Sequence, residues 1–99
     1  MRVIAKSTLR AFWIKAGRAD AEQPLLMWHR EAERANWLSP ADVKRQYGSA
    51  SILKGGRVVF NVAGNKYRIV VAIRYDLQIV FIRFVGTHAE YDQIDVHEI

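Results

Sequence analysis

The amino-acid sequence predicts an α+β fold in which helices come first and a small antiparallel sheet follows. Up to residue 48, apolar residues recur at the three- and four-residue spacing of a helix. From residue 57 onward they alternate with polar residues, as in strands that bury one face, and short turns separate these segments. A chain of 99 residues can build one modest core, so we expect a single domain over residues 1–99.

The helical part is predicted from its caps and its apolar stripes. Ser7 is placed to cap a first helix that ends near Gly17, and its apolar face comprises Leu9, Phe12, Trp13 and Ala16. Asp20 begins a capping-box pattern for a second helix, whose apolar stripe comprises Leu25, Trp28, Ala32 and Ala35. Ser39 and Pro40 are typical of a helix start, so a third and shorter helix is expected there.

The sheet is expected to be a three-strand meander joined by a short strand from the N-terminus. Alternating patterns predict strands over residues 57–62 and 66–75. Residues 78–85 are apolar on both faces except Arg83, as in a strand near the middle of a sheet, and a further short strand is expected over residues 2–5. Tight turns at Gly64-Asn65 and Asp76-Leu77 make the three consecutive strands antiparallel. The first two helices should pack on one face of this sheet. A second capping-box pattern at Thr87 predicts a short helix over residues 88–95.

The strand over residues 66–74 indicates which face of the sheet is buried. One set of alternate residues is apolar and should face the helices: Tyr67, Ile69, Val71 and Ile73. The other set belongs to a more open face: Lys66, Arg68, Val70, Ala72 and Arg74. By the same alternation Arg57, Asn61 and Arg83 are expected on this open face. It is basic and has no compensating acidic residues along these strands.

Charge is distributed unevenly along the chain. The whole sequence carries 15 Lys and Arg against 10 Asp and Glu, a net charge of +5. Residues 43–83 hold eight basic residues and one acidic residue, a net charge of +7, whereas residues 84–99 hold four acidic residues and no Lys or Arg. A basic middle of this density favours a polyanion such as nucleic acid as partner. The alternative is the solvated sheet face of an ordinary basic protein.

Several classes of protein are disfavoured by the composition. The chain has no cysteine, which excludes disulfide scaffolds, thiolate metal sites and thiol nucleophiles. It has no apolar run near the roughly 20 residues that a membrane span needs, and its first residues lack the apolar stretch of a secretory signal. We therefore expect a cytoplasmic protein that has no membrane partner.

Three parts of the sequence together resemble one family of bacterial toxins. They are Trp37-Leu-Ser-Pro-Ala-Asp-Val-Lys44, Arg57-Val-Val-Phe-Asn-Val-Ala-Gly-Asn-Lys-Tyr-Arg68, and the run from Ile79 to Asp92 that contains Gly86-Thr-His-Ala-Glu-Tyr-Asp92. They resemble the HigB family, within the wider RelE-like group, and the resemblance covers nearly the whole chain. It implies a small antiparallel sheet with two N-terminal helices on one side. It also implies cleavage of messenger RNA on translating bacterial ribosomes, and a helix-turn-helix antitoxin of the HigA type as partner.

The resemblance also implies roles for individual residues. Lys66-Tyr67-Arg68-Ile69-Val70 is similar to the Tyr-Arg-Leu-Val stretch of RelE-like toxins, whose arginine contacts RNA phosphate. His88 and Tyr91 follow the last long strand, where that group places catalytic side chains. With Arg83 as a second phosphate clamp, the expected catalytic residues are Arg68, His88, Tyr91 and Arg83. The expected RNA-binding residues are Lys54, Arg57, Asn61 and Lys66.

These residue types suit RNA cleavage that uses no cofactor. A base must take the proton of the ribose 2′-OH, cations must hold the phosphate, and an acid must protonate the leaving 5′-oxygen. Histidine titrates near neutral pH, so His88 can serve as acid or base. Arg68 has a planar, permanently charged fork that matches phosphate oxygens. Tyr91 can stack on a base or orient the phosphate.

Each of these residues also has a purely structural interpretation. His88 can simply begin a short helix, Tyr91 can pack on the sheet edge, and Arg83 can pair with Glu90 or Asp92. A metal site is not expected, because alternate positions along a helix point to different sides and do not converge; the residues considered are His88, Glu90, Asp92, Asp95 and His97. The alternative function is a non-catalytic RNA-binding module or co-repressor subunit, and a third is a structural interaction domain.

Overall fold

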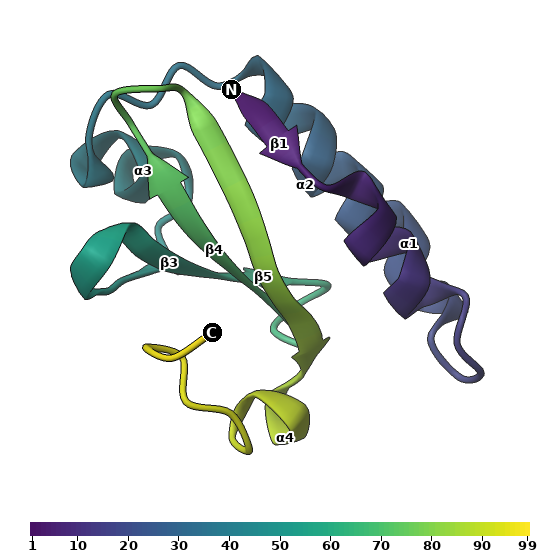
Figure 1. The fold of residues 1–99 in the computed structure, drawn as a ribbon. Coiled ribbons are helices and arrows are strands. Elements are labelled where there is room, and N and C mark those ends of the chain that lie inside the picture. The colour runs from purple at the N-terminus through teal and green to yellow at the C-terminus, as the bar shows by residue number, and fades with distance from the viewer.

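The computed structural model describes residues 1–99 and confirms the α+β fold (Figure 1). One sheet has the strand order β1-β5-β4-β3-β2. The strands are β1 (Arg2–Ile4), β2 (Ser51–Ile52), β3 (Arg57–Val62), β4 (Tyr67–Arg74) and β5 (Ile79–Thr87). The helices are α1 (Lys6–Trp13), α2 (Glu22–Arg34), α3 (Pro40–Gln46) and α4 (His88–Tyr91), with 3-10 turns at Ala19–Ala21 and Lys54–Gly56. None of the helices has the length and apolar character that crossing a bilayer requires.

The sheet is mixed, which differs in one respect from the prediction. Strands β3, β4 and β5 form the expected antiparallel meander. Strand β1, however, pairs with β5 in parallel, with Arg2 opposite Ile79 and Ile4 opposite Phe81. Local patterns specify the strands of a hairpin but not the direction in which a distant strand adds to the edge. The edge strand β2 is only two residues long, too short to show alternation, and was not predicted.

The first two helices lie in the predicted places but start differently. The residue before α1 is Ala5 and no side chain caps this helix, so Ser7 lies inside its first turn. Helix α2 begins at Glu22, after a 3-10 turn. Asp20, the predicted cap, instead pairs with Lys66 and accepts a hydrogen bond from the Tyr67 hydroxyl at 2.6 Å. The long-range partners of this carboxylate therefore replace the local cap.

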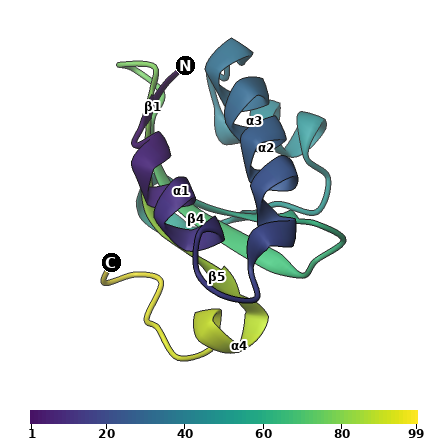
Figure 2. The ribbon, with the colours of Figure 1, turned by 90° about the vertical axis from the view of Figure 1, so that its right-hand side faces the viewer.

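Helices α1 and α2 cover one face of the sheet (Figure 2). The predicted inward residues of β4 are buried there together with the predicted stripe of α2 and with Leu9 and Phe12 of α1. The prediction is wrong for Ala16, which is exposed beyond the end of α1, and Trp13 is half-buried. Phe12 of α1 packs edge-on against Tyr67, and Trp28 of α2 packs against Phe60, with ring centroids 5.3 Å apart in each pair. These two contacts attach the helices to β4 and β3 and position the strands that carry the basic residues.

The opposite face of the sheet is partly covered by the C-terminal segment. Val59 and Val70 belong to this face, yet they are 2% and 0% exposed. After α4 the chain turns back across this side of the sheet (Figure 1), and Arg57 Nη2 donates to the main-chain oxygen of Ile99 at 2.6 Å. The apolar residues of the segment are half-buried and its acidic residues are exposed: Ile94, Val96 and Ile99, against Asp92, Asp95 and Glu98. The prediction of an open face without acidic neighbours is therefore wrong in part.

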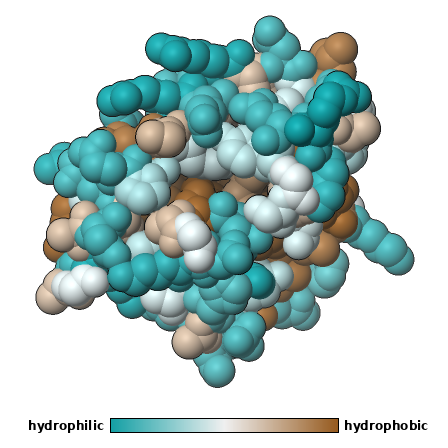
Figure 3. Space-filling model, turned by 180° about the vertical axis from the view of Figure 1, so that it is seen from behind, coloured by the Kyte–Doolittle hydropathy of each residue, from teal (hydrophilic) through white to brown (hydrophobic).

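The outer surface is largely hydrophilic. Seen from behind, polar and charged side chains dominate the molecule, while apolar side chains gather in a central hollow and near the rim (Figure 3). Five large apolar side chains are exposed across the whole surface: Ile14, Met27, Leu38, Ile52 and Leu77. Two of them, Ile14 and Met27, belong to the layer formed by α1 and α2.

Candidate functional site

Three of the predicted site residues come together where β5 passes into α4. Arg68 lies on β4 opposite Gly86 of β5, and His88 follows two residues later as the first residue of α4. The Arg68 Nε donates to His88 Nε2 at 3.3 Å. The Arg68 guanidinium carbon also lies 4.6 Å from the centroid of the Tyr91 ring. We call Arg68, His88 and Tyr91 the arginine–histidine cluster.

The geometry of α4 explains why His88 and Tyr91 face the same arginine. Residues three apart lie on the same side of a helix, so both side chains project toward β4. The predicted capping box is confirmed: Thr87 Oγ1 accepts from the Glu90 main-chain N at 3.1 Å, and a Glu90 carboxylate oxygen accepts from the Thr87 N at 2.9 Å. This box fixes the start of the helix. The helix ends at Tyr91 rather than at residue 95, because the chain then turns back over the sheet.

Two residues that sequence reasoning did not place in the site support α4. Arg18, between α1 and α2, forms an ion pair with Glu90 at 2.7 Å. The alternative pairing of Glu90 with Arg83 is therefore wrong. Gly86, opposite Arg68, is buried, and a Cβ there would lie 2.5 Å from the Phe84 ring. The capping-box pattern predicted a local role for Glu90 at the start of α4. No pattern in the nearby sequence indicated that Glu90 would also pair with Arg18, 72 residues away.

The cluster leaves hydrogen-bonding groups free for a ligand. Arg68 uses only Nε within the protein, so its two terminal nitrogens have no protein partner. His88 Nε2 accepts this bond, so that nitrogen carries a lone pair and no proton in this arrangement. The stacking of Tyr91 on the guanidinium orients the arginine and leaves the phenol hydroxyl unpaired. The free groups are thus the cationic fork and the phenol hydroxyl, while the imidazole lone pair is held by Arg68 and becomes available only when that bond is exchanged.

The pH dependence of stability provides a test of the support for α4. The pKa of Glu90 lies below its ordinary value, mainly because the Thr87 main-chain N–H donates to the carboxylate, with help from Arg18. A lowered carboxyl pKa stabilises the fold above the unfolded pKa, and this contribution disappears as pH falls through the folded pKa. We expect Glu90→Gln to lower stability by about 0.5–1 kcal/mol at pH 7. The difference from wild type should shrink below about pH 4. Thermal unfolding of both proteins between pH 3 and 7 measures it, and a difference independent of pH would contradict this account.

Of the four predicted RNA-binding residues, Asn61 is the one next to the cluster. Asn61 lies directly opposite Arg68 in the β3–β4 ladder, its Nδ2 donates to Ser49 O at 3.0 Å, and its Oδ1 is buried without a partner. Arg57 lies on the same face, as predicted, but its Nη2 is held by Ile99 and its Nε is buried without a partner. The face next to Arg68 therefore contains polar atoms that the protein itself does not satisfy.

The remaining predicted residues lie outside the cluster. Arg83 is exposed, and its guanidinium carbon lies 5.3 Å from the centroid of the Phe81 ring; no hydrogen bond or ion pair joins it to the cluster. Lys54 is exposed in the 3-10 turn before β3. Lys66 pairs with Asp20 beside the helices, so its predicted place on the open face is wrong. The reason is that residue 66 belongs to the turn, and strand alternation begins only at Tyr67. Nowhere in residues 1–99 do three or more His, Asp or Glu side chains gather as metal ligands.

Comparison with known families places this geometry in context. The model of a family described as HigB_toxin, the RelE-like toxic component of a toxin-antitoxin system, matches residues 21–94. The match runs from the start of α2 to just past α4 and includes every residue of the arginine–histidine cluster. No curated protein sequence matches the chain.

Proposed function

The chain belongs to the HigB toxin family, the RelE-like toxic components of toxin–antitoxin systems, and from this premise we propose that it is an endoribonuclease. Its substrate is messenger RNA on translating ribosomes in the bacterial cytoplasm, and a HigA-type helix-turn-helix antitoxin neutralises it. The observation that carries the proposal is the meeting of Arg68, His88 and Tyr91 at one point. These residues come from two distant parts of the chain, and each is of a type that phosphodiester chemistry needs.

Arg68 binds the scissile phosphate in this mechanism. Its free terminal nitrogens form a planar fork that donates two parallel hydrogen bonds to phosphate oxygens. Negative charge builds on those oxygens as the phosphorus becomes pentacoordinate, so these donors stabilise the transition state more than the ground state. The bond from Nε to His88 and the stacking on Tyr91 hold the fork in place before RNA arrives.

His88 moves the proton of the attacking group. Before RNA binds, its Nε2 lone pair accepts the Arg68 Nε–H bond; this bond is exchanged for the ribose 2′-OH when Arg68 takes the neighbouring phosphate, and Nε2 then accepts the 2′-OH proton. Tyr91 supplies the remaining unpaired hydroxyl of the cluster, and we assign it the donation of a proton to the leaving 5′-oxygen. Both proton-transfer roles thus fall to side chains that contact Arg68.

The strand of RNA is bound by basic and amide groups on the same side of the sheet. Asn61 is next to Arg68, and rotation of its side chain would bring the buried, unpaired Oδ1 outward to accept from a base or ribose. Arg83 and Lys54 are exposed cations without an ion-pair partner, and they contribute phosphate contacts farther along the strand. A domain of this size contacts few nucleotides, so the ribosome presents the message in the extended form that cleavage needs.

Replacing His88 by glutamine is expected to slow cleavage by about 10²–10⁴-fold while RNA binding changes little. Glutamine keeps a hydrogen bond to Arg68 but cannot exchange a proton at neutral pH. Single-turnover cleavage of ribosome-bound message measures the rate, and a binding assay on the same complex is the control. An unchanged rate would move the proton transfer to Tyr91 or to a lysine.

Primer extension on a translated message distinguishes this function from the alternative. An endoribonuclease produces new ends when the wild-type chain is expressed and none when Arg68 and His88 are both replaced. A non-catalytic RNA-binding module or co-repressor subunit binds RNA in a salt-sensitive manner but produces no new ends with either chain. The absence of new ends with wild type would therefore reject the enzymatic function.

A further inference from the structure

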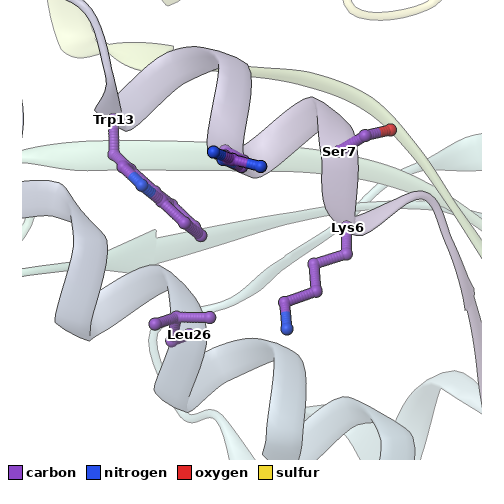
Figure 4. Close-up of a pocket in the computed structure, with 5 residues that line it drawn as sticks. Lys6, Ser7, Trp13 and Leu26 are labelled. Carbon is purple, nitrogen blue, oxygen red and sulfur yellow. The ribbon is translucent and has the colours of Figure 1, made fainter.

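The helical layer carries a groove that shares no residue with the arginine–histidine cluster. It lies between α1 and α2, has a volume of about 460 Å³, and is lined by Lys6, Ser7, Arg10, Trp13 and Leu26. In Figure 4, Lys6 and Trp13 extend from α1 toward the space between the two helices, and Leu26 of α2 faces them. Nothing in the proposed cleavage reaction uses these residues.

The two cations of the groove have no partner within the protein. Lys6 and Arg10 are four residues apart, so they lie on the same side of α1. Both are exposed, and neither takes part in any of the five ion pairs of the structure or in a side-chain hydrogen bond. Lys6 is also the first residue of α1, whose first turn contains no acidic residue.

A lysine at this position is unfavourable for the helix itself. The N-terminus of a helix has a partial positive charge, which repels a cation and favours an acidic side chain. No acidic residue in the first turn of α1 offsets this repulsion. The stability of α1 therefore does not explain why residue 6 is a lysine. A local conflict of this kind is typical of residues that serve binding.

The rest of the groove is apolar and partly exposed. Trp13 and Leu26 are half-buried, and the residues that directly follow them, Ile14 and Met27, are 67% and 62% exposed. Tryptophan, methionine and arginine are enriched in protein–protein interfaces relative to the rest of the surface. An RNA strand would find one aromatic ring here beside aliphatic side chains, whereas a peptide can bury both kinds of surface.

We propose that this groove binds an acidic segment of the antitoxin, whose carboxylates pair with Lys6 and Arg10 and whose apolar side chain packs between Trp13 and Leu26. The identity of the partner rests on the proposed function as a toxin. The unpaired cations require an acidic ligand, and the apolar walls require that it be a protein segment. An antitoxin anchored on the helical layer keeps the chain from the ribosome and leaves the arginine–histidine cluster unfilled.

A charge-reversal variant tests the proposal. Lys6→Glu with Arg10→Glu should weaken binding of the purified HigA-type antitoxin at least tenfold in a calorimetric titration. The variant should unfold at about the same temperature as wild type, since glutamate is favourable at residue 6 in the first turn of α1 and unfavourable at residue 10 in the last. The matched control is Lys15→Glu with Arg34→Glu, which makes the same change in net charge on exposed, unpaired residues outside the groove and should bind within about twofold of wild type.

A second measurement locates the contact. Trp28 and Trp37 are 1% and 2% exposed, so among the three tryptophans only Trp13 can meet a ligand directly. With 5-fluorotryptophan in the chain, the resonance assigned to Trp13 by a Trp13→Phe variant should shift when antitoxin is added.

The outcomes separate this proposal from the cleavage function. Full antitoxin binding by the Lys6/Arg10 variant, or a Trp13 resonance that does not move, overturns the groove as the docking site. Loss of ribosome binding with normal antitoxin binding also overturns it and makes the groove a nucleic-acid surface. A chain that binds antitoxin through this groove yet cuts no message supports the inference and contradicts only the proposed cleavage.

Discussion

Replacing Arg68 by alanine is expected to abolish growth arrest and to lower the rate of RNA cleavage by about 10²–10³-fold. Arg68 is the group whose free donors can hold the phosphate as charge develops. The fold should persist, because the side chain is only half-buried and contributes one hydrogen bond to His88 and one stacking contact with Tyr91. Their combined loss should lower stability by about 1–2 kcal/mol.

Two further variants test whether the loss of activity is specific to the guanidinium group of Arg68. Arg68→Lys should recover only part of the activity, because an ammonium group cannot reproduce the planar fork. Arg74→Ala is the matched control: Arg74 lies on the same strand, is exposed, and pairs only with Asp76. Growth after induced expression and the melting temperature of each purified variant are the measurements. An Arg68→Ala protein that is folded at the growth temperature and still arrests growth would falsify the assignment of Arg68.

The part of the fold that the sequence predicts well is the part with local periodicity. Strands β3 and β4 follow from their alternation, β5 follows from an apolar run interrupted only by Arg83, and the turns follow from Gly64-Asn65 and Asp76-Leu77. The parallel pairing of β1 with β5 could not be predicted from local patterns. It depends on how α1 and α2 pack on the sheet, and so on which strand edge β1 meets. The same holds for the tail that crosses the other face of the sheet and accepts a hydrogen bond from Arg57, since nothing in residues 92–99 indicates which surface they will meet.

The candidate site shows the same division. The family resemblance identified Arg68, His88 and Tyr91, and the spacing of three within α4 explains why the last two face the same residue. Lys66 was misplaced because Asp20, 46 residues away, draws its ammonium group toward the helices. Partners that are distant in sequence decide which of several basic side chains remain free, and strand alternation contains no information about them.

A 2′-deoxy substitution at the cleaved nucleotide is expected to block the reaction almost completely while binding persists. The 2′-OH is already adjacent to the phosphorus, so attack by this group needs only removal of its proton and stabilisation of the phosphate. The His88 Nε2 lone pair can remove the proton once its bond to Arg68 is exchanged for the 2′-OH, and the Arg68 fork can stabilise the phosphate. A substrate without that hydroxyl still offers its phosphates and bases to Arg68, Asn61 and Arg83, so its affinity should change little.

The products distinguish attack by the 2′-OH from attack by water. The first route leaves a 2′,3′-cyclic phosphate on the upstream fragment and a free 5′-OH on the downstream fragment, because the 5′-oxygen is the leaving group. Enzymatic ligation that requires a 5′-phosphate should therefore fail on the downstream fragment until a kinase has phosphorylated it. The His88→Gln variant should yield the same ends more slowly, since histidine changes the rate of proton transfer but not the identity of the nucleophile. Downstream fragments that ligate without kinase, or rapid cutting of the deoxy substrate, would show that water attacks the phosphorus.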